Sequence, residues 1–138
     1  MSVRKVNRIE LPQHGDDSRG QLVIAEAGTT IPFAIKRVFY IYGVDRQTIR
    51  GAHANRNTEF VLICIVGKCK IRVKDGRENE VVYCLERPNE GIYLPKMVWK
   101  DMYDFSEDAV LLVLASEHYD IVEYIRDYDA YVKECSMT

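Results

Sequence analysis

The chain has 138 residues, of which 47% are hydrophobic and 29% charged, and its formal net charge at pH 7 is −2. This length and composition predict one globular domain, residues 1–138, that is large enough to bury a core. The mild acidity, without any block of basic residues, argues against nucleic acid or anionic lipid as a partner.

The hydropathy of the sequence indicates neither a targeting signal nor a membrane span. No window reaches the run of about 18 apolar residues that spans a bilayer, and no apolar stretch of signal length follows the N-terminus. We therefore expect a cytoplasmic protein without membrane contact. The four cysteines, Cys64, Cys69, Cys84 and Cys135, form no C-x-x-C pair, and three lie in apolar strand-like runs. This pattern favours buried reduced thiols over disulfides or zinc.

Taken in chain order, the residues predict short strands separated by turns. The N-terminal segment 3–11 alternates polar and apolar residues too weakly to define a buried face of its own. Runs of β-branched, aromatic and aliphatic residues then predict strands over residues 38–42, 60–66, 68–73, 80–85, 91–94 and 110–115. Lys74-Asp75-Gly76-Arg77 predicts a hairpin turn, and Val66-Gly67-Lys68 a second reversal.

The last part of the chain changes its pattern. Residues 110–115 are apolar at every position, which is typical of a strand covered on both faces. Apolar residues over 119–132 recur at nearly helical spacing and predict a C-terminal helix with Asp120 as its N-cap. The sequence thus predicts an all-β fold with a short C-terminal helix, and a jelly-roll barrel is the closure that the pattern favours.

One motif carries most of the chemistry. Arg50-Gly51-Ala52-His53-Ala54-Asn55, followed by Glu59, resembles the metal motif of cupin barrels, which takes two His from an H-x-H strand, a Glu and a third His from a later strand. Here Asn55 stands at the second His and Lys100 at the third. Because only His53 and Glu59 remain, we expect no metal and no cofactor.

A family resemblance becomes specific at this point. Six segments in matching order resemble the nucleotide-sugar 3,4-ketoisomerases of the cupin superfamily, the WxcM-like dTDP-4-keto-6-deoxyglucose 3,4-ketoisomerases: residues 31–40, 50–54, 95–99, 104–106, 113–116 and 124–129. The resemblance implies a cupin jelly-roll barrel, a dTDP-linked keto-deoxysugar as substrate, and movement of its carbonyl from C4 to C3. It also implies a homodimer with exchanged N-terminal strands. The weak pattern of residues 3–11 fits that exchange.

The departures from the family pattern bear on the chemistry. Family members commonly carry H-x-H where this chain has His53-Ala54-Asn55, and His or Arg where it has Lys100. Asn55 can hold a substrate hydroxyl but cannot take up a proton. Arg19 matches a family position where Arg or Tyr occurs, and with Lys100 it leads us to expect the galacto configuration at C4 of the product.

The reaction assigns roles to the remaining candidates. A single base with a pKa near 7 can remove the C3 proton and return it to C4, and His53 is that candidate. Lys100, Asn55 and Tyr40 are candidates to stabilise the enediolate.

Binding of the nucleotide needs a second set of residues. Arg37 and Arg50 are the expected ligands of the diphosphate, because guanidinium groups match phosphate oxygens. Trp99, Tyr42 and Tyr93 are candidates to stack on the base or sugar, and Glu59 to contact substrate.

Other interpretations remain open from the residues alone. Trp99 and the tyrosines can equally belong to the core, Lys100 can be a solvated rim residue, and Glu59 can pair with a basic side chain. A sugar-nucleotide-binding cupin without catalysis, or an epimerase acting on the same class of substrate, would show much the same sequence.

Overall fold

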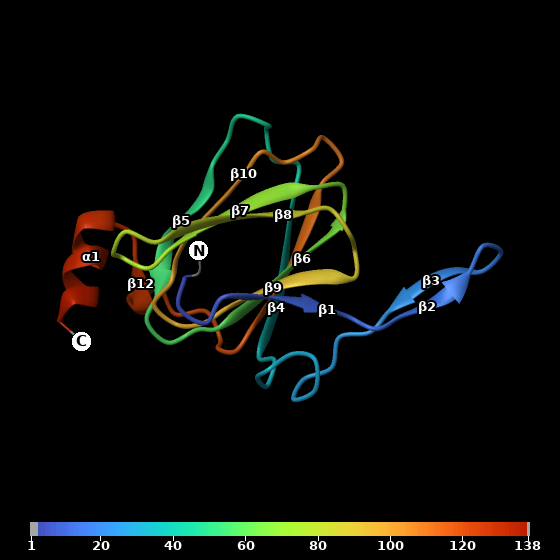
Figure 1. Ribbon diagram of the computed structural model, residues 1–138, viewed down its shortest axis with the longest axis horizontal. Coiled ribbons are helices and arrows are strands. Elements are labelled where there is room, and N and C mark those ends of the chain that lie inside the picture. Colours follow the sequence, from blue (N-terminus) through green and yellow to red (C-terminus); the bar gives the residue numbers. More distant parts are fainter. Residues whose placement is uncertain (1–2, 138) are drawn as a thin grey trace.

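The structure, a computed structural model, describes residues 3–137. Within this range the chain forms two five-stranded antiparallel sheets, a two-stranded hairpin and one α-helix (Figure 1). The first sheet has the order β1 (Asn7–Glu10), β9 (Glu90–Leu94), β6 (Phe60–Val66), β11 (Val110–Ala115), β4 (Arg37–Tyr42). The second has the order β12 (Tyr124–Ile125), β5 (Arg50–Asn55), β10 (Trp99–Tyr103), β7 (Cys69–Lys74), β8 (Glu80–Leu85).

All six predicted strands are present, and their ends shift by at most one residue. Six strands of residues 3–137 lie outside the predicted runs: β1, the hairpin strands β2 (Gln13–Asp16) and β3 (Gly20–Val23), β5, β10 and β12. β1, β2, β3 and β12 are very short, and every residue of β2 is exposed, so no apolar alternation marks them. Charged residues such as Arg50, Lys100 and Asp101 interrupt the apolar pattern of β5 and β10. The all-β fold with one short C-terminal helix is confirmed.

The main core lies between the two sheets. Alternate residues of the first sheet, such as Leu62 and Val113, meet Ile71 and Val73 of the second. A second cluster covers the outer face of the first sheet, where Leu114 packs with buried residues of the N-terminal segment and β6: Leu11, Ile31, Phe33, Val61 and Ile63. Strand β11 is therefore covered on both faces, as its continuous apolar run predicts.

The C-terminal helix begins later than the sequence predicts. Asp120 caps only the 3₁₀-helix Ile121–Glu123, and α1 (Tyr128–Ser136) has Asp127 as its N-cap, whose Oδ2 accepts from the Ala130 amide at 2.9 Å. The predicted helix is wrong between these two caps, because β12 pairs there with β5 and takes its backbone hydrogen bonds from that strand. Local spacing could not anticipate this pairing.

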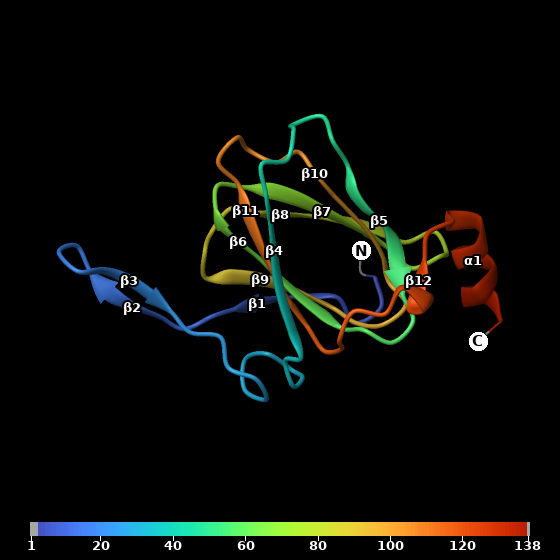
Figure 2. The same ribbon diagram turned by 180° about the vertical axis from the view of Figure 1, so that it is seen from behind.

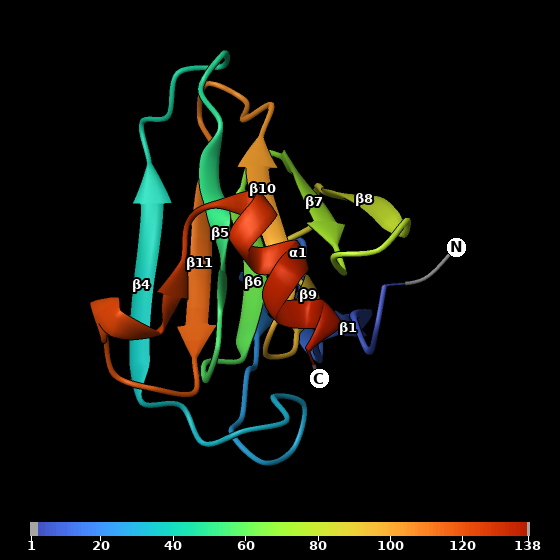
Figure 3. The same cartoon turned by 90° about the vertical axis from the view of Figure 1, so that its left-hand side faces the viewer.

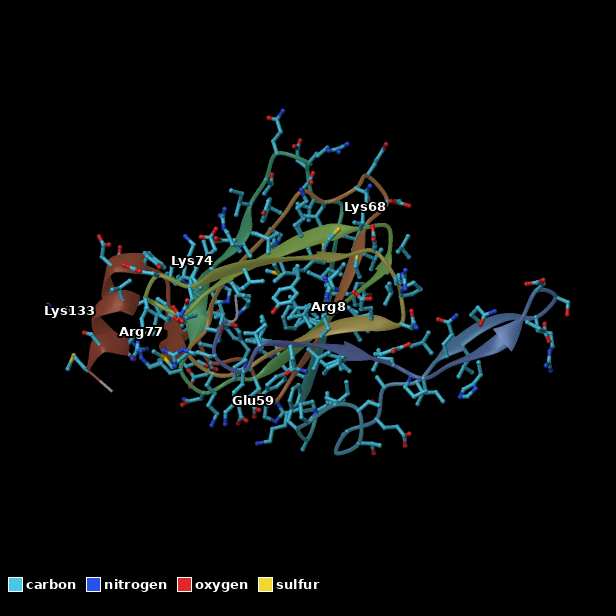
Figure 4. All side chains as sticks on the ribbon, viewed as in Figure 1. Arg8, Glu59, Lys68, Lys74, Arg77 and Lys133 are labelled. Atoms are coloured by element: carbon cyan, nitrogen blue, oxygen red, sulfur yellow. The ribbon has the colours of Figure 1, made fainter. Side chains whose placement is uncertain are left out.

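Helix α1 covers the outer face of the second sheet (Figure 3). Tyr131 is fully buried, and its hydroxyl donates to the carbonyl oxygens of Lys74 at 3.1 Å and Met97 at 2.8 Å. Lys74 and Arg77, labelled in Figure 4, lie beside this helix. The helix thereby holds β12 and the edge of β5 in place.

The N-terminal segment packs on its own barrel. Val3 and Val6 are buried in the main core, and β1 pairs with β9 in the same chain. The expectation that residues 3–11 lack a buried face is wrong, because contacts with distant strands bury them. Beyond β1, the β2–β3 hairpin projects from the barrel (Figures 1 and 2).

The four cysteines are free thiols, and three of them are buried. Across residues 3–137, no helix is both long enough and apolar enough to cross a membrane.

Candidate active site

A pocket with a cavity volume of about 230 Å³ lies between the two sheets, where the edge strand β4 faces β5 and β12. Its wall comes from both sheets and from the segment that joins β11 to α1. The lining residues are Phe39, Ile41, Arg50, Gly51, His53, Phe60, Leu62, Lys100, Met102, Val113, Tyr119, Tyr124 and Arg126. Of the residues predicted for the site, the pocket brings together His53, Lys100 and Arg50.

A β-bulge in β5 sets the direction of His53. Lys100 pairs with His53 and Asp101 pairs with Gly51, so Ala52 is an extra residue in the ladder. Gly51 and Ala52 both have left-handed backbone angles, with φ of 84° and 54°. Glycine is favoured at the first position, because its φ is left-handed and an added Cβ would lie only 3.0 Å from the Lys100 carbonyl oxygen. Bulges of this kind re-aim the next side chain, here the imidazole of His53.

His53 is held as a neutral imidazole. Its Nδ1 lies 3.0 Å from the Gly51 carbonyl oxygen, which can only accept, so Nδ1 carries the proton and Nε2 is left as an acceptor. Burial, reinforced by the nearby charge of Lys100, lowers the pKa of His53 to about 3. The imidazole is therefore neutral at pH 7, the form that can accept a proton, but its pKa lies well below the value near 7 that the sequence predicts for the base.

Lys100 is buried rather than solvated at the rim, with only 4% of its surface exposed. Its Nζ donates to Asn55 Oδ1 at 3.1 Å and lies 4.2 Å from the centre of the Phe60 ring. Burial lowers the pKa of Lys100 to about 7, and the charge of Glu123 partly offsets that effect. An amine with this pKa exchanges protons readily near neutral pH.

The pocket is strongly cationic. Arg50, Lys100 and Arg126 line it, and none of its lining residues is acidic. Arg37 lies beside it, on the same face of β4 as Phe39. Its Nε donates to the Glu117 carbonyl oxygen at 3.1 Å, while its buried Nη2 has no hydrogen-bond partner within residues 3–137. A buried unpaired guanidinium nitrogen beside a cationic cavity suits an anionic ligand.

Three predicted aromatic residues do not line this pocket. Tyr40 and Tyr42 are 62% and 71% exposed, because strand residues alternate and Phe39 and Ile41 take the pocket face of β4. Trp99 packs against Tyr128 and Tyr131 of α1, on the opposite face of β10 from Lys100. These three side chains therefore lie outside the pocket of their own chain, and their contact with substrate stays a prediction.

Glu59, Tyr93 and Arg19 also lie elsewhere. The Tyr93 hydroxyl donates to Glu59 Oε1 at 2.6 Å, and Tyr93 packs with the outer cluster of the first sheet, away from the pocket. Burial and the neighbouring Glu59 raise the pKa of Tyr93 above its usual range. Arg19 is on the exposed hairpin, where it pairs with Asp16 at 3.0 Å.

The separation of His53 from Glu59 also bears on metal binding. No group of three or more His, Cys, Asp or Glu side chains within residues 3–137 could hold a metal ion. The residues present therefore do not fit a cupin metal centre.

Sequence reasoning missed Tyr119, Tyr124 and Arg126 as pocket residues. Residues 124 and 126 fall within a segment that carries the family resemblance, which was the one available signal. Their position depends on the pairing of β12 with β5, and the sequence pattern predicts a helix for this segment instead of a strand.

Two facing antiparallel sheets that enclose such a pocket define a small cupin-type barrel. A family profile described as "FdtA: WxcM-like, C-terminal" matches residues 4–136. The chain belongs to this family. It is 44% identical over 117 residues to a TDP-4-oxo-6-deoxy-alpha-D-glucose-3,4-oxoisomerase of Aneurinibacillus thermoaerophilus, covering 85% of this chain and 84% of that protein.

Solved structures agree with this assignment. The sugar 3,4-ketoisomerase QdtA from Thermoanaerobacterium thermosaccharolyticum in complex with TDP is 42% identical, with a TM-score of 0.94 and coverage of 99% of this chain and 98% of that chain. The TDP-quinovose 3,4-ketoisomerase WlaRB from Campylobacter jejuni is also 42% identical, with a TM-score of 0.89 and coverage of 95% and 99%. A 3'-monoepimerase from Streptomyces bikiniensis shares the fold at 18% identity, with a TM-score of 0.77 and coverage of 90% and 70%.

Proposed function

We propose that this protein is a sugar 3,4-ketoisomerase that converts dTDP-4-keto-6-deoxy-D-glucose to a dTDP-3-keto-6-deoxyhexose. The observation that carries the proposal is the pairing of His53 with Lys100 across β5 and β10, inside a cationic pocket. A relative 44% identical bears the name of this activity. The epimerase alternative has weaker support, since the epimerase with the same fold is only 18% identical.

His53 is the proposed base. Its Nε2 removes the C3 proton, the C3–H electrons form the C3–C4 double bond, and the C4 carbonyl oxygen takes the negative charge. The C3 hydroxyl proton passes to the C4 oxygen, and His53 returns its proton to C4, which leaves a hydroxyl at C4 and the ketone at C3. Atoms and electrons balance within the sugar, so the reaction needs no oxidant and no cofactor.

Lys100 is the proposed electrophile. A donor aimed at the enediolate oxygens in a dry pocket supplies about 3–4 kcal/mol of transition-state stabilisation. Because its pKa is near 7, Lys100 can also exchange the hydroxyl proton. Asn55 accepts from the ammonium and so orients it, and we propose this role in place of direct contact with a substrate hydroxyl.

Three arginines are the proposed ligands of the dTDP diphosphate. Arg50 and Arg126 line the pocket, and Arg37 lies beside it with a free Nη2. Guanidinium forks match phosphate oxygens.

We also propose a homodimer in which the β2–β3 hairpin reaches the partner. The hairpin extends away from its own barrel (Figure 2), and β4 presents the exposed apolar side chains of Val38, Tyr40 and Tyr42 on the outer face of an edge strand. In such a dimer Arg19 would lie near the partner's pocket, where it and Lys100 would favour the galacto product. We assign the protein to the cytoplasm, where free thiols remain reduced.

The test is the reaction in D₂O. Wild type should move the carbonyl to C3 and incorporate deuterium at C4, and His53→Asn should abolish both while the barrel stays folded. Exchange with the carbonyl remaining at C4 would indicate an epimerase. Binding of dTDP-sugar with neither isomerisation nor exchange would indicate a non-catalytic binding protein.

A further inference from the structure

Tyr124 contacts three side chains that have proposed roles in catalysis or nucleotide binding. Its ring centre lies 4.8 Å from that of His53, with an angle of 49° between the planes. The Arg126 guanidinium lies 4.9 Å above the same ring. Its hydroxyl accepts from Arg37 Nη1 at 3.5 Å. One side chain therefore touches the proposed base and two proposed ligands of the diphosphate.

The backbone of Tyr124 is fixed to the strand that carries His53. Tyr124 pairs with Asn55 and Ile125 with Ala54, and the Arg56 amide donates to the Glu123 carbonyl oxygen at 3.0 Å. The Glu123 carboxylate is anchored in turn, since it accepts from the amides of Asn57 at 3.0 Å and Thr58 at 3.1 Å. The tyrosine ring is thus presented to His53 from a rigid support.

His53 needs such a neighbour. The hydrogen bond between its Nδ1 and the Gly51 carbonyl oxygen restrains one edge of the ring and leaves rotation about that contact open. A flat aromatic surface against the imidazole limits this rotation. Transfer of a proton at carbon is sensitive to displacements of about 1 Å.

We propose that Tyr124 is a positioning residue: its ring holds the His53 imidazole with Nε2 toward the C3–C4 edge of the sugar, and its hydroxyl orients Arg37 toward the diphosphate. The inference rests on the proposed ketoisomerase function. In this proposal the ring of Tyr124 affects catalysis and its hydroxyl affects nucleotide binding. A residue that only packs in the core would not show these two separate effects.

Tyr124→Phe and Tyr124→Leu test the two parts separately. The Phe variant keeps the ring, so kcat should stay within about twofold of wild type, while the Kd for TDP rises about three- to tenfold through loss of the Arg37 contact. The Leu variant should show a similar rise in Kd and also a fall in kcat on the order of 10- to 100-fold. Ile125, buried under α1, keeps β12 in place in both variants.

Tyr103→Leu is the matched control. Tyr103 is on β10, the strand on the other side of β5 from β12, and Arg72 stacks on its ring at 5.1 Å, but it does not line the pocket. The control should keep both kcat and the Kd for TDP. Circular dichroism and thermal unfolding check the fold of all three variants.

A readout that needs no turnover separates failure of this inference from failure of the proposed function. In the TDP complex, NMR should show sharp His53 ring signals in wild type and Tyr124→Phe, and exchange-broadened ring signals in Tyr124→Leu, because only that variant frees the ring to rotate. If wild type does not isomerise, the proposed function falls, and the ring signals still report on Tyr124. Sharp ring signals in Tyr124→Leu, wild-type kcat in that variant, or an equal loss of kcat in Tyr124→Phe would each overturn the inference.

Discussion

His53 and Lys100 face each other across neighbouring strands, directly beside a bulge that inserts Ala52 into the ladder. A buried cation and an imidazole at this spacing influence each other, and the charge of Lys100 helps to lower the pKa of His53. An anionic intermediate between them would offset the repulsion between the ammonium of Lys100 and a protonated His53, because a negative charge is attracted to both. The pocket is therefore poised for negative charge.

Replacing Gly51 by Ala should disturb this pair. The new Cβ would meet the Lys100 carbonyl oxygen at 3.0 Å and Met102 Cε at 3.2 Å, at a backbone φ of 84°. We expect a loss of about 1–3 kcal/mol in the free energy of unfolding and a marked fall in kcat. Gly43→Ala is the matched control, since Gly43 has φ of 70° and a Cβ added there would meet no heavy atom within 4 Å. Equal losses in both variants by urea denaturation would show that backbone strain alone is responsible.

Replacing Lys100 by Met should stabilise the protein while removing its activity. The pKa of Lys100 falls from its ordinary 10.5 to about 7 in the folded chain. Between these pH values the unfolded chain binds a proton that the folded chain has released, so the stability of wild type rises with pH. At pH 7 and below, Lys100→Met should gain about 1–3 kcal/mol relative to wild type. Urea denaturation should show this gain shrinking from pH 7 toward pH 10, and a difference independent of pH would contradict the assignment.

Removal of the guanidinium groups should weaken nucleotide binding. Arg37→Ala, Arg50→Ala and Arg126→Ala should each lose about 1.5–3 kcal/mol in TDP binding, the scale of a charged hydrogen bond. Arg87→Ala is the control, because Arg87 lines a separate surface hollow with Arg8 and Glu90. Titration calorimetry measures all four variants. Unchanged affinity in the three pocket variants, with the fold intact, would move the diphosphate elsewhere.

The exposed face of β4 should be needed for the dimer. Tyr42 is 71% exposed on this edge strand, and Tyr42→Glu would place a charge in an apolar interface. We expect light scattering at micromolar concentration to show a dimer for wild type and a monomer for Tyr42→Glu. Val82→Glu on β8, an edge strand of the other sheet, should remain dimeric. A monomeric wild type would remove the proposed dimer altogether.

The purified protein should carry no stoichiometric transition metal. His53 and Glu59 are the two surviving positions of the cupin metal motif, and Glu59 instead binds the Tyr93 hydroxyl. Two potential ligands that do not converge cannot make a tight site. Elemental analysis that finds about one zinc, iron or manganese per chain, lost in His53→Asn, would refute this prediction.

The sequence by itself determined the class of fold and six of the strands, and it supplied His53 and Lys100 as the proposed reacting pair. Runs such as residues 60–66 and 110–115 predicted β6 and β11 because their composition suits a doubly covered strand. The motif around His53 and the position of Lys100 predicted two residues of the pocket, because the spacing of motif residues can be read from the sequence. The sequence could not tell whether Lys100 lies in the pocket or is solvated at its rim, because burial is a property of the assembled barrel.

Only the tertiary structure decided which face each side chain takes. Tyr40 and Phe39 are neighbours in sequence, yet only Phe39 lines the pocket, because a strand alternates and its register against β11 selects the inner residue. Residues 119–132 carry a nearly helical period, but the edge of β5 captures Tyr124 and Ile125 as a strand. That long-range pairing brings Tyr124 and Arg126 to His53. Contacts between residues about 70 positions apart depend on chain packing, which local propensity does not encode.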